Sequence, residues 1–381
     1  MVRLSVGLAP AHAAAECVEL VRAADDAGLY GCYLGDDLGF QDPWVICGAA
    51  ARETERIRLG LSVTHAYLRE PTMIAQGLAT LDQLSGGRIE AGIGIGSVPA
   101  LDAHHVEHQR PIPRLRESLS VIRRLLDEGR IDHEGEFFHY TGVRLGIRPV
   151  QRHLPLLVGA MVGPRSLRLA GEVADGVHAT GCSRTYAEYV VEHVSEGARQ
   201  AGRDPGDLDI ATFAITVVAD DTETARWAAR AMVAGWMASF PRPLVTRLGL
   251  SEDVIDPIAT AMGRGEVEQA LRRTPDDLVD ALAVAGTPEE CVERIRTDIV
   301  GSGIGHLVMG IADPTLVHAV VGREPELPDL RGQLDLITAG ILPALTQPRP
   351  GTPTRSPDED EPPTPLDVSG GAQERDGRRT G

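Results

Sequence analysis

Two adjacent carboxylates follow an apolar run near residue 35 of the chain. The segment reads Gly35-Asp36-Asp37, and paired acids at the end of a strand could hold a metal ion or act as general acid and base. Neighbouring residues of a strand point to opposite faces, so only one of Asp36 and Asp37 can face a site at that strand end. The alternative is a helix-capping aspartate beside a solvated one.

A second group of ionisable side chains comprises His104, His105, Glu107 and His108. Histidines four residues apart would suit a metal if they lay on a helix. Prolines stand on both sides and predict an irregular loop over residues 98–113, and the chain lacks an HExxH pattern. We therefore predict no metal site here.

Two glycine-containing segments could receive a ligand through their backbone. GIGIGS, residues 92–97, has a glycine at every second position, which is not the GxGxxG spacing of dinucleotide sites. Glycines at a strand end still leave the backbone open to a ligand. In VGAMVGPR, from Val158, a turn at Gly163-Pro164 leads into a helix near Arg165. Free amides and an arginine at a helix start could bind an anion. The alternative is an ordinary turn between a strand and a helix, which has the same sequence pattern.

The elements that position these groups alternate along the chain. Strand-like runs occur at 3–9, 31–36, 57–63, 88–95, 155–160, 176–180, 209–218 and 304–311. Helical patterns occur at 13–28, 43–54, 72–84, 114–128, 164–174, 184–201, 221–239 and 287–300. Eight strands alternating with helices predict a closed (β/α)8 barrel, with an open eight-stranded sheet as the alternative.

Insertions interrupt this alternation. Residues 98–113 follow the fourth strand, residues 130–153 predict a small hairpin, and residues 240–286 predict an insertion after the seventh strand that caps the barrel mouth. We assign residues 1–345 to one barrel domain. The proline-rich segment 346–381 cannot bury enough apolar surface to order itself, so we expect it to be disordered.

Composition excludes several classes of function. The chain has 381 residues and a net charge of -18, which disfavours nonspecific binding to nucleic acid or anionic membranes. It contains no lysine, so Schiff-base chemistry and the GxxxxGK[ST] phosphate loop are impossible. Its five cysteines are scattered and predict core residues of a reducing compartment. The short apolar start predicts a first strand rather than a signal peptide, and we expect a cytoplasmic protein.

Several segments together resemble one family. They are LGLSVTHAY, IAQGLATLDQLSGGRIEAGIGIGS, HEGEFFHYTGVRLGIRP, VGAMVGPRSLRLAGEVADGV and GTPEEC. In order and spacing they resemble the bacterial-luciferase-like (β/α)8 oxidoreductases. Within these the chain is most similar to the branch that uses the deazaflavin coenzyme F-420, particularly the methylenetetrahydromethanopterin reductases.

The resemblance implies roles for matched positions. Ser62-Val63 would form a cis peptide in a bulge that supports the coenzyme ring. The other implied coenzyme-binding residues are Thr64, Gly94, Gly96 and Ser97 near the ring, and Gly159, Ala160 and Gly163 at the coenzyme phosphate. Asp36 matches the family's strand-two aspartate. Asp37 and His65, at adjacent strand ends, are the best candidates for proton transfer.

The chain also departs from the family pattern. Asp36-Asp37 stands where the family often has Asp-His. The methanopterin reductases carry a glutamate where this chain has Gly7, and an acid where it has Ser97. The resemblance therefore implies that the cofactor half of the site is kept and the substrate half is changed.

These patterns lead to one principal hypothesis. We expect an oxidoreductase that transfers a hydride between coenzyme F-420 and an unidentified organic substrate, and that forms a homodimer or higher homo-oligomer. The alternatives are an FMN-dependent luciferase-like monooxygenase and a non-catalytic barrel that binds a flavin or another ligand.

Overall fold

A closed barrel of parallel strands forms the centre of the chain. The computed structural model describes residues 2–37, 39–237 and 242–346. Its main sheet has nine strands, and all but β10 form the barrel, which closes through the β8–β9 and β11–β1 pairs. The barrel strands are β1 (Arg3–Leu8), β2 (Gly31–Leu34), β3 (Arg58–His65), β4 (Ile89–Gly94), β7 (Leu156–Gly159), β8 (Gly176–Thr180), β9 (Asp209–Val218) and β11 (His306–Ile311). The predicted (β/α)8 barrel is confirmed, with a strand in each of the eight predicted runs.

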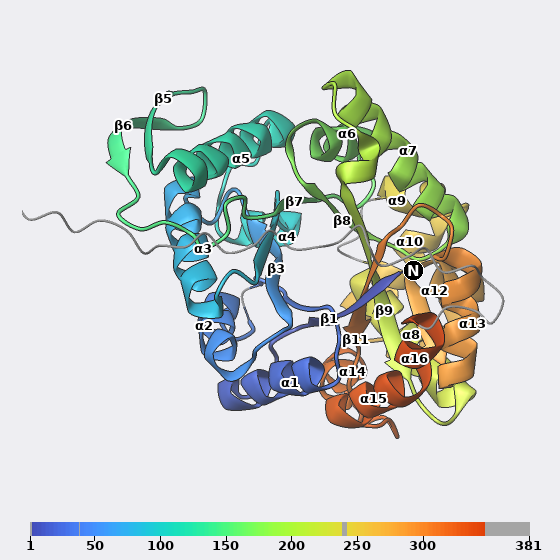
Figure 1. Ribbon diagram of the computed structural model, residues 1–381. Coiled ribbons are helices and arrows are strands. Elements are labelled where there is room, and N and C mark those ends of the chain that lie inside the picture. The colour runs from blue at the N-terminus through green and yellow to red at the C-terminus, as the bar shows by residue number, and fades with distance from the viewer. Residues whose placement is uncertain (1, 38, 238–241, 347–381) are drawn as a thin grey trace, which may run out of the picture. The chain divides into compact units, whose positions relative to one another are not determined.

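Helices surround this barrel (Figure 1). They are α1 (Ala14–Asp26), α2 (Pro43–Glu53), α3 (Pro71–Ser85), α5 (Pro111–Glu128), α6 (Pro164–Val173), α7 (Arg184–Gln200), α8 (Thr222–Trp236) and α13 (Pro288–Asp298). Proline opens five of them, a position where its missing N–H costs no helical hydrogen bond. In front of α13, Thr287 and Glu290 form a capping box. A helix is present at each predicted position, although residues 238 and 239 of the predicted seventh helix lie outside the described residues.

The insertions differ partly from expectation. The predicted hairpin is confirmed as the antiparallel pair β5 (Arg130–Glu134) and β6 (His139–Arg144). The prediction of irregular structure over residues 98–113 was wrong for its first part, because α4 (Val98–Ala103) accepts Pro99 in its first turn, where a proline is tolerated. Helix α5 also begins three residues before its predicted start at 114.

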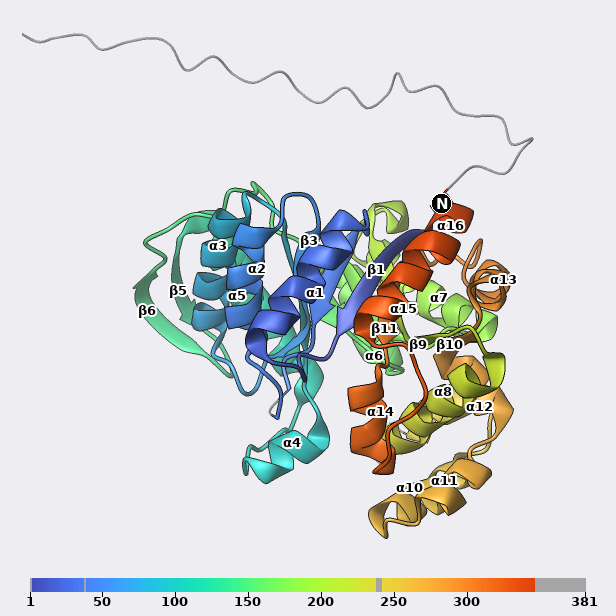
Figure 2. The same cartoon turned by 90° about the horizontal axis from the view of Figure 1, so that it is seen from below.

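The segment after β9 folds into short helices. It contains α9 (Arg242–Arg247), α10 (Ile255–Gly263), α11 (Val267–Arg273), α12 (Asp276–Leu282) and the strand β10 (Ala283–Gly286), which pairs with the end of β9. One 3-10 turn lies within this segment at Glu252–Val254, and another precedes β9 at Pro205–Asp207. Figure 2 shows α4, α10, α11 and α14 (Pro314–Val321) on the same side of the barrel.

The described chain ends in helices that the sequence did not predict. They are α14, α15 (Leu330–Leu336), a π-helical turn at Ile337–Ile341 and α16 (Leu342–Thr346). The predicted disordered tail lies outside the described residues, apart from Thr346.

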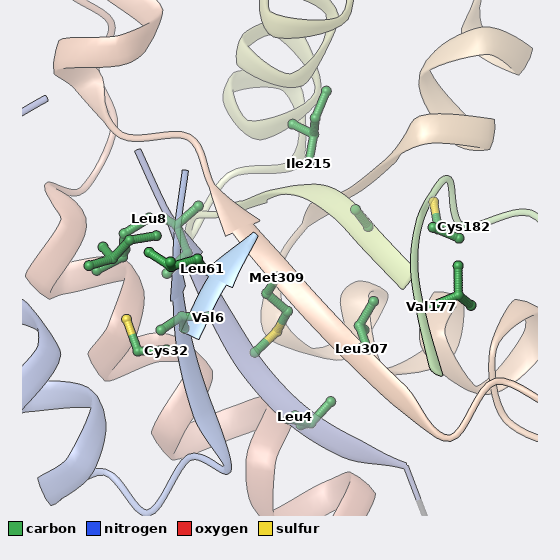
Figure 3. Close-up of a cluster of buried hydrophobic side chains, with 14 of the residues drawn as sticks. Leu4, Val6, Leu8, Cys32, Leu61, Val177, Cys182, Ile215, Leu307 and Met309 are labelled. Carbon is green, nitrogen blue, oxygen red and sulfur yellow. The ribbon is translucent and has the colours of Figure 1, made fainter. Parts of the chain in front are cut away.

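The main apolar core lies between the strands and the helices. Val6, Cys32, Leu61 and Met309 point outward from neighbouring strands into this layer, and each is at most 1% exposed (Figure 3). All five cysteines are buried and unpaired. This confirms the interpretation of the cysteines as core residues.

Inside the barrel, large side chains lie against glycines of neighbouring strands. A Cβ atom at Gly60 would lie 2.5 Å from the ring of Tyr33, which is itself buried. A Cβ atom at Gly310 would lie 1.9 Å from the ring of Phe213, and one at Gly7 would lie 2.7 Å from the same ring. The interior therefore has room for each large ring only because a glycine stands next to it.

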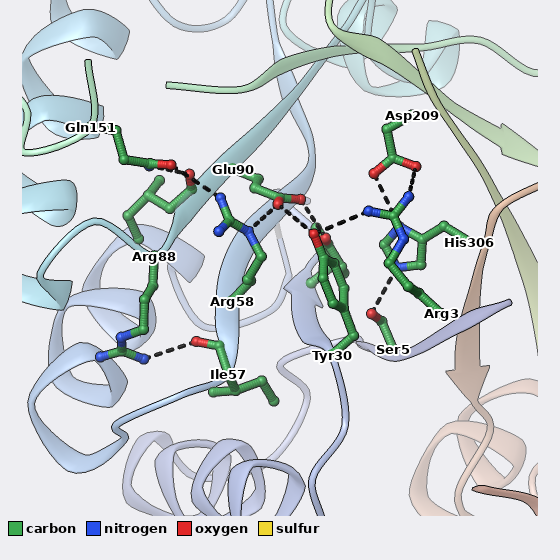
Figure 4. A network of polar contacts seen from close by, with 12 residues as sticks. Arg3, Ser5, Tyr30, Ile57, Arg58, Arg88, Glu90, Gln151, Asp209 and His306 are labelled. Atoms are coloured by element: carbon green, nitrogen blue, oxygen red, sulfur yellow. Dashed lines mark hydrogen bonds and ion pairs between the residues drawn. The ribbon is translucent and has the colours of Figure 1, made fainter. Parts of the chain in front are cut away.

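At the N-terminal ends of the strands the interior is polar (Figure 4). The Glu90 carboxylate accepts hydrogen bonds from the hydroxyls of Tyr33 at 2.6 Å and Tyr30 at 3.2 Å, and it pairs with Arg58. Arg3 donates to the Tyr30 hydroxyl at 3.2 Å. Because each buried charge has an opposite charge and hydrogen-bond donors nearby, the network offsets the cost of its desolvation.

A second carboxylate extends this network across the barrel. Asp209 accepts a hydrogen bond from Arg3 at 2.6 Å and lies 3.5 Å from the Nδ1 atom of His306. The Nε2 atom of His306 is 2.7 Å from the Ser5 hydroxyl. Burial alone would raise the pKa of Asp209, but His306 and Arg3 hold that pKa below its usual value.

Closer to the middle of the barrel, His178 connects β8 to β3. Its Nδ1 atom lies 2.8 Å from the Ser62 hydroxyl, and its ring contacts those of Tyr33 and His306 edge-on. Its Nε2 atom has no hydrogen-bond partner within the described ranges. Burial, together with the nearby His306, lowers the pKa of His178 to about 3. The ring is therefore neutral at physiological pH.

Helices α6 and α7 approach each other through two glycines. A Cβ atom at Gly171 would lie 2.0 Å from the carbonyl oxygen of Val194, and one at Gly197 would lie 2.0 Å from the carbonyl oxygen of Arg168. Both clashes are with backbone, which cannot swing aside as a side chain can.

Replacing Gly197 by alanine should therefore destabilise the fold. We expect Gly197→Ala to lower the free energy of unfolding by roughly 1–3 kcal/mol, because the two helices must separate to admit one methyl group. Urea denaturation followed by circular dichroism measures this. Gly263→Ala is the matched control: Gly263 ends α10, has open space around its Cα and should change stability little. Equal stabilities of the two variants would contradict the close helix packing.

The neutral state of His178 predicts a pH-dependent stability. The unfolded histidine binds a proton below its ordinary pKa of 6.5 and the folded one only below about 3, so stability should fall as pH drops through this interval. Between about pH 4.5 and 6.5 most carboxylates stay ionised, and His178 contributes up to about 1.4 kcal/mol per pH unit.

His178→Gln tests this contribution, because glutamine can still bond to Ser62 but does not titrate. Urea titrations of both proteins across this pH range should give a shallower stability slope for the variant. His193, whose pKa burial also lowers, remains in both proteins and cancels in the comparison. Parallel slopes would show that His178 is not the neutral group inferred from its burial.

Candidate functional site

The sequence-predicted site residues lie at the carboxyl ends of four neighbouring strands. Asp36 follows β2, and Thr64 and His65 end β3. Gly94 ends β4 and is followed by Ser97, the residue before α4. The turn 159–163 follows β7. Parallel barrel strands end on one face, so the fold brings all of these residues to the face where barrel enzymes place their sites.

The Asp36 carboxylate is surrounded by donors. It accepts hydrogen bonds from the Thr64 hydroxyl at 2.7 Å, from Trp44 Nε1 at 3.1 Å, and from Nε and Nη2 of Arg69 at 2.7 and 2.9 Å. Burial would raise the pKa of Asp36, but these hydrogen bonds and the charge of Arg69 lower it. The carboxylate is therefore ionised, and its bonds join the ends of β2 and β3 to the start of α2.

Neither Trp44 nor Arg69 was among the predicted site residues. Arg69 stands four positions after His65 in the loop that leads to α3, and its guanidinium also lies over the Trp44 ring at 5.3 Å. The pairing depends on how the two loops fold back on each other. In the sequence, the only sign of this pairing with Asp36 was an arginine shortly after the end of a strand.

His65 is buried and held on one side only. Its Nε2 atom makes a short contact with the carbonyl oxygen of Asp36, which can only accept, so Nε2 carries the proton and donates. Its Nδ1 atom is then an acceptor, and it has no hydrogen-bond partner in the described chain. Gly96 permits this placement: it has a positive φ of 87°, and a Cβ atom there would lie 2.4 Å from Nδ1.

The two adjacent aspartates have different surroundings. Asp37 is exposed, and its carboxylate makes no hydrogen bond or ion pair with a described residue, whereas that of Asp36 accepts four hydrogen bonds. Hydrogen bonds thus hold the Asp36 carboxylate in place, whereas the Asp37 carboxylate faces solvent. This matches the argument that neighbouring residues at a strand end cannot share one face.

The peptide bond between Ser62 and Val63 is cis, as expected, and the pairing of β3 with β4 shifts register between Leu61 and Thr64. At this bulge the Val63 side chain turns toward glycines. Cβ atoms at Gly94 and Gly159 would lie 2.6 and 2.7 Å from its methyl groups. The predicted glycines thus make room for the bulge.

The turn after β7 presents free backbone donors. The Ala160 amide donates to the His178 carbonyl at 3.0 Å, but the amides of Val162 and Gly163 have no acceptor among the described residues. Gly163 is the cap of α6, and Arg165 in its first turn forms no ion pair with a described residue. Arg165 also borders a groove of about 650 Å³ between α5, α6 and the β5–β6 hairpin. Unpaired amides, a helix start and a free guanidinium fit an anionic group.

The histidine cluster after α4 has local partners. His104 Nδ1 lies 2.7 Å from the carbonyl oxygen of Ala100, and His108 lies 3.7 Å from Asp102. Across residues 2–37, 39–237 and 242–346, no group of three or more His, Cys, Asp or Glu side chains is arranged to hold a metal ion. The same part of the chain has no helix that is both long and apolar enough to span a membrane.

Comparison with known proteins gives relatives along most of the chain. The 5,10-methylenetetrahydromethanopterin reductase of Archaeoglobus fulgidus is 29% identical, over 85% of this chain and 94% of that protein. The F-420-dependent glucose-6-phosphate dehydrogenase of Nakamurella multipartita is 31% identical, over 77% of this chain and 85% of that protein.

Among solved structures, the coenzyme F-420-dependent tetrahydromethanopterin reductase of Methanopyrus kandleri superposes with a TM-score of 0.80. It is 26% identical and covers 90% of this chain and 99% of its own. The sequence profile described as luciferase-like monooxygenase matches residues 2–306. The chain therefore belongs to the luciferase-like monooxygenase family of oxidoreductase enzymes, as its sequence motifs indicated.

Proposed function

We propose that this protein transfers a hydride between coenzyme F-420 and a small organic substrate. One observation carries the proposal: the Ser62–Val63 bulge against Gly94 and Gly159 stands beside a turn whose Val162 and Gly163 amides have no acceptor in the described chain. The bulge would support a flat ring and the amides would bind an anionic tail. These are the two parts of a phosphate-bearing deazaflavin. The names of the relatives support the same coenzyme, since both the Nakamurella and the Methanopyrus enzymes are F-420-dependent.

The residues present fit such a coenzyme. Ser62, Val63 and Thr64 would support its ring, with Gly94, Gly96 and Ser97 approaching its edge through their backbones. Gly159, Ala160 and Gly163 would surround its phosphate, beside the unpaired amide of Val162. When bound, the deazaflavin supplies a ring carbon that carries a hydride.

The protein's own residues would orient the groups around that ring. Asp36 accepts four hydrogen bonds from Arg69, Trp44 and Thr64, so we propose that it positions the β2 and β3 ends. His65 presents a buried, unpaired Nδ1 acceptor, and Asp37 presents a free carboxylate. We propose that these two residues take up or deliver a proton during turnover.

We also propose a compartment and an assembly. Five buried, unpaired thiols support a reducing compartment such as the cytoplasm. A groove on α2 and α3 is bordered by Val45 and Met73, which are 68% and 60% exposed, and by Leu84 at 39%. Apolar side chains gathered on one outer face support contact with a second copy of the chain.

The coenzyme assignment predicts selective binding and separable catalysis. Purified protein should bind coenzyme F-420, seen in the visible absorbance of the coenzyme, in preference to FMN. Asp37→Asn and His65→Ala should keep that binding and lose turnover by roughly 10²–10⁴-fold, the usual contribution of general acid–base catalysis. A panel of imines, enones and alcohols supplies the substrates.

His139→Ala is the matched control for the histidine variant, because His139 is exposed on β6, outside the barrel, and should leave turnover unchanged. Full turnover in both Asp37→Asn and His65→Ala would remove their assigned roles. Tight binding of FMN without binding of F-420 would overturn the coenzyme proposal. Binding without turnover of any substrate class would favour a non-catalytic barrel.

The assembly proposal predicts a mass change on charge insertion. Met73→Glu places a carboxylate in the apolar face of α3 and should convert a homodimer to monomers in light scattering, because burying an unpaired charge is costly. The control Thr80→Glu, on an exposed position at the edge of the same groove, should weaken association less. A monomeric wild-type protein would contradict the proposed assembly.

A further inference from the structure

Two tyrosines of α7 make contact with the turn that follows β7. Tyr186 and Tyr189 stand three residues apart, so both face the same side of the helix. The Tyr186 hydroxyl donates to the carbonyl oxygen of Met161, and the Tyr189 hydroxyl donates to the carbonyl oxygen of Val162 at 2.9 Å. Two successive carbonyls of the turn are thus fixed toward α7.

These two bonds also fix the amides of the turn. In a trans peptide the C=O of one residue and the N–H of the next point in opposite directions. With the Met161 and Val162 carbonyls directed at α7, the N–H groups of Val162 and Gly163 must point away from it. Neither of these amides has an acceptor among the described residues, and the preceding amide of Met161, whose orientation the two bonds do not set, has none either.

The tyrosines are themselves held firmly. Tyr186 is fully buried, and its hydroxyl also accepts a hydrogen bond from the Thr180 amide at 3.2 Å. Gly181 has a φ of 137°, and a Cβ atom there would lie 2.9 Å from the Tyr186 ring, so the glycine makes the close contact possible. Burial raises the pKa of Tyr186, which keeps its hydroxyl protonated and able to donate.

Tyr189 is fixed by its neighbours on the other side. The Arg247 guanidinium of α9 lies over its ring at 5.0 Å, and the His193 ring lies 4.4 Å away. The tight α6–α7 contact at Gly171 and Gly197 keeps the distance between α7 and the turn constant. Neither hydroxyl can therefore follow the turn if its peptides rotate.

We propose that Tyr186 and Tyr189 are positioning residues that aim the Val162 and Gly163 amides at the phosphate of the coenzyme. The inference rests on the proposed function, because it takes the anion of this turn to be the coenzyme's phosphate. The tyrosine hydroxyls bond to the Met161 and Val162 carbonyls and so act on the coenzyme only through the turn. Their effect is confined to the phosphate end, and this distinguishes it from a general structural role.

Tyr189→Phe tests the proposal, because it removes one hydroxyl and keeps the ring contacts with Arg247 and His193. Dissociation constants are measured by fluorescence titration for coenzyme F-420, for hydroxydeazariboflavin 5′-phosphate, which ends at the phosphate, and for hydroxydeazariboflavin, which has the same ring and ribityl chain without the phosphate or the tail beyond it. The phosphate preference is read from the last two ligands. The wild-type protein should prefer the 5′-phosphate. In the variant that preference should fall by roughly tenfold, the loss of one hydrogen bond to a charged group, with affinity for hydroxydeazariboflavin changed less than twofold.

Tyr30→Phe is the control. It removes a tyrosine hydroxyl bound to Glu90 and Arg3 at the N-terminal end of the barrel, and the preference should stay at the wild-type value. Tyr186→Phe should act like Tyr189→Phe if it folds, but the conclusion depends on the half-buried Tyr189 alone.

The possible failures separate the two proposals. If the wild-type protein binds none of the three ligands, the proposed function is wrong and the inference falls with it. If the wild-type protein binds hydroxydeazariboflavin and its 5′-phosphate equally, the coenzyme proposal stands and the phosphate does not lie at this turn. If Tyr189→Phe keeps the wild-type preference, or weakens both of these ligands alike, the tyrosine does not position the amides and the inference is overturned.

Discussion

The structure depends on the matching of large interior side chains with glycines on adjacent strands. Tyr33 lies over Gly60, and Phe213 lies over Gly310. A barrel of eight strands has an interior just wide enough for side chains to fill, so each large ring requires a neighbour without a Cβ atom. This constraint explains the glycines at positions 7, 60 and 310, which lie in strands, where glycine otherwise weakens pairing.

The two ends of the barrel differ in how their buried polar groups are paired. At the N-terminal end, Glu90 and Asp209 are buried with Arg58, Arg3 and tyrosine hydroxyls, so their charges are compensated within the protein. At the carboxyl end, an imidazole nitrogen of His65 and the amides of Val162 and Gly163 in the turn after β7 are left without partners in the described chain. Unpaired polar groups at a strand-end face are costly for folding, and they are useful where a ligand can complete them. The site is thus one place in the barrel where described polar groups lack partners, as the Nε2 atom of His178 does nearer the middle.

The sequence predicted the barrel well because hydrophobic periodicity and the residues that begin and end helices are local signals. Alternating apolar runs located all eight barrel strands, and prolines and caps located the surrounding helices. Helix α4 was missed because Pro99 was taken to exclude a helix, although a proline fits the first turn. Arg69, His178 and Tyr189 were missed for another reason: each acts on a residue that only the folded chain brings near. The Asp36–Arg69 pairing joins the loops after β2 and β3, and the Tyr189–Val162 bond joins α7 to the turn after β7. Spacing within a segment carries no information about such contacts.

The change at Gly7 follows from the same interior constraint. The resemblance to the methanopterin reductases implies a glutamate at this strand-one position. Here a Cβ atom at Gly7 would lie 2.7 Å from the Phe213 ring, and that ring stacks on Trp236 with centroids 5.9 Å apart. A glutamate at position 7 therefore requires the ring to move, and the ring is fixed between Gly310 and the end of α8. An aromatic pair from β9 and α8 thus occupies the space that an acidic side chain at position 7 would enter. A carboxylate side chain at position 7 would therefore require a smaller side chain in place of Phe213 as well.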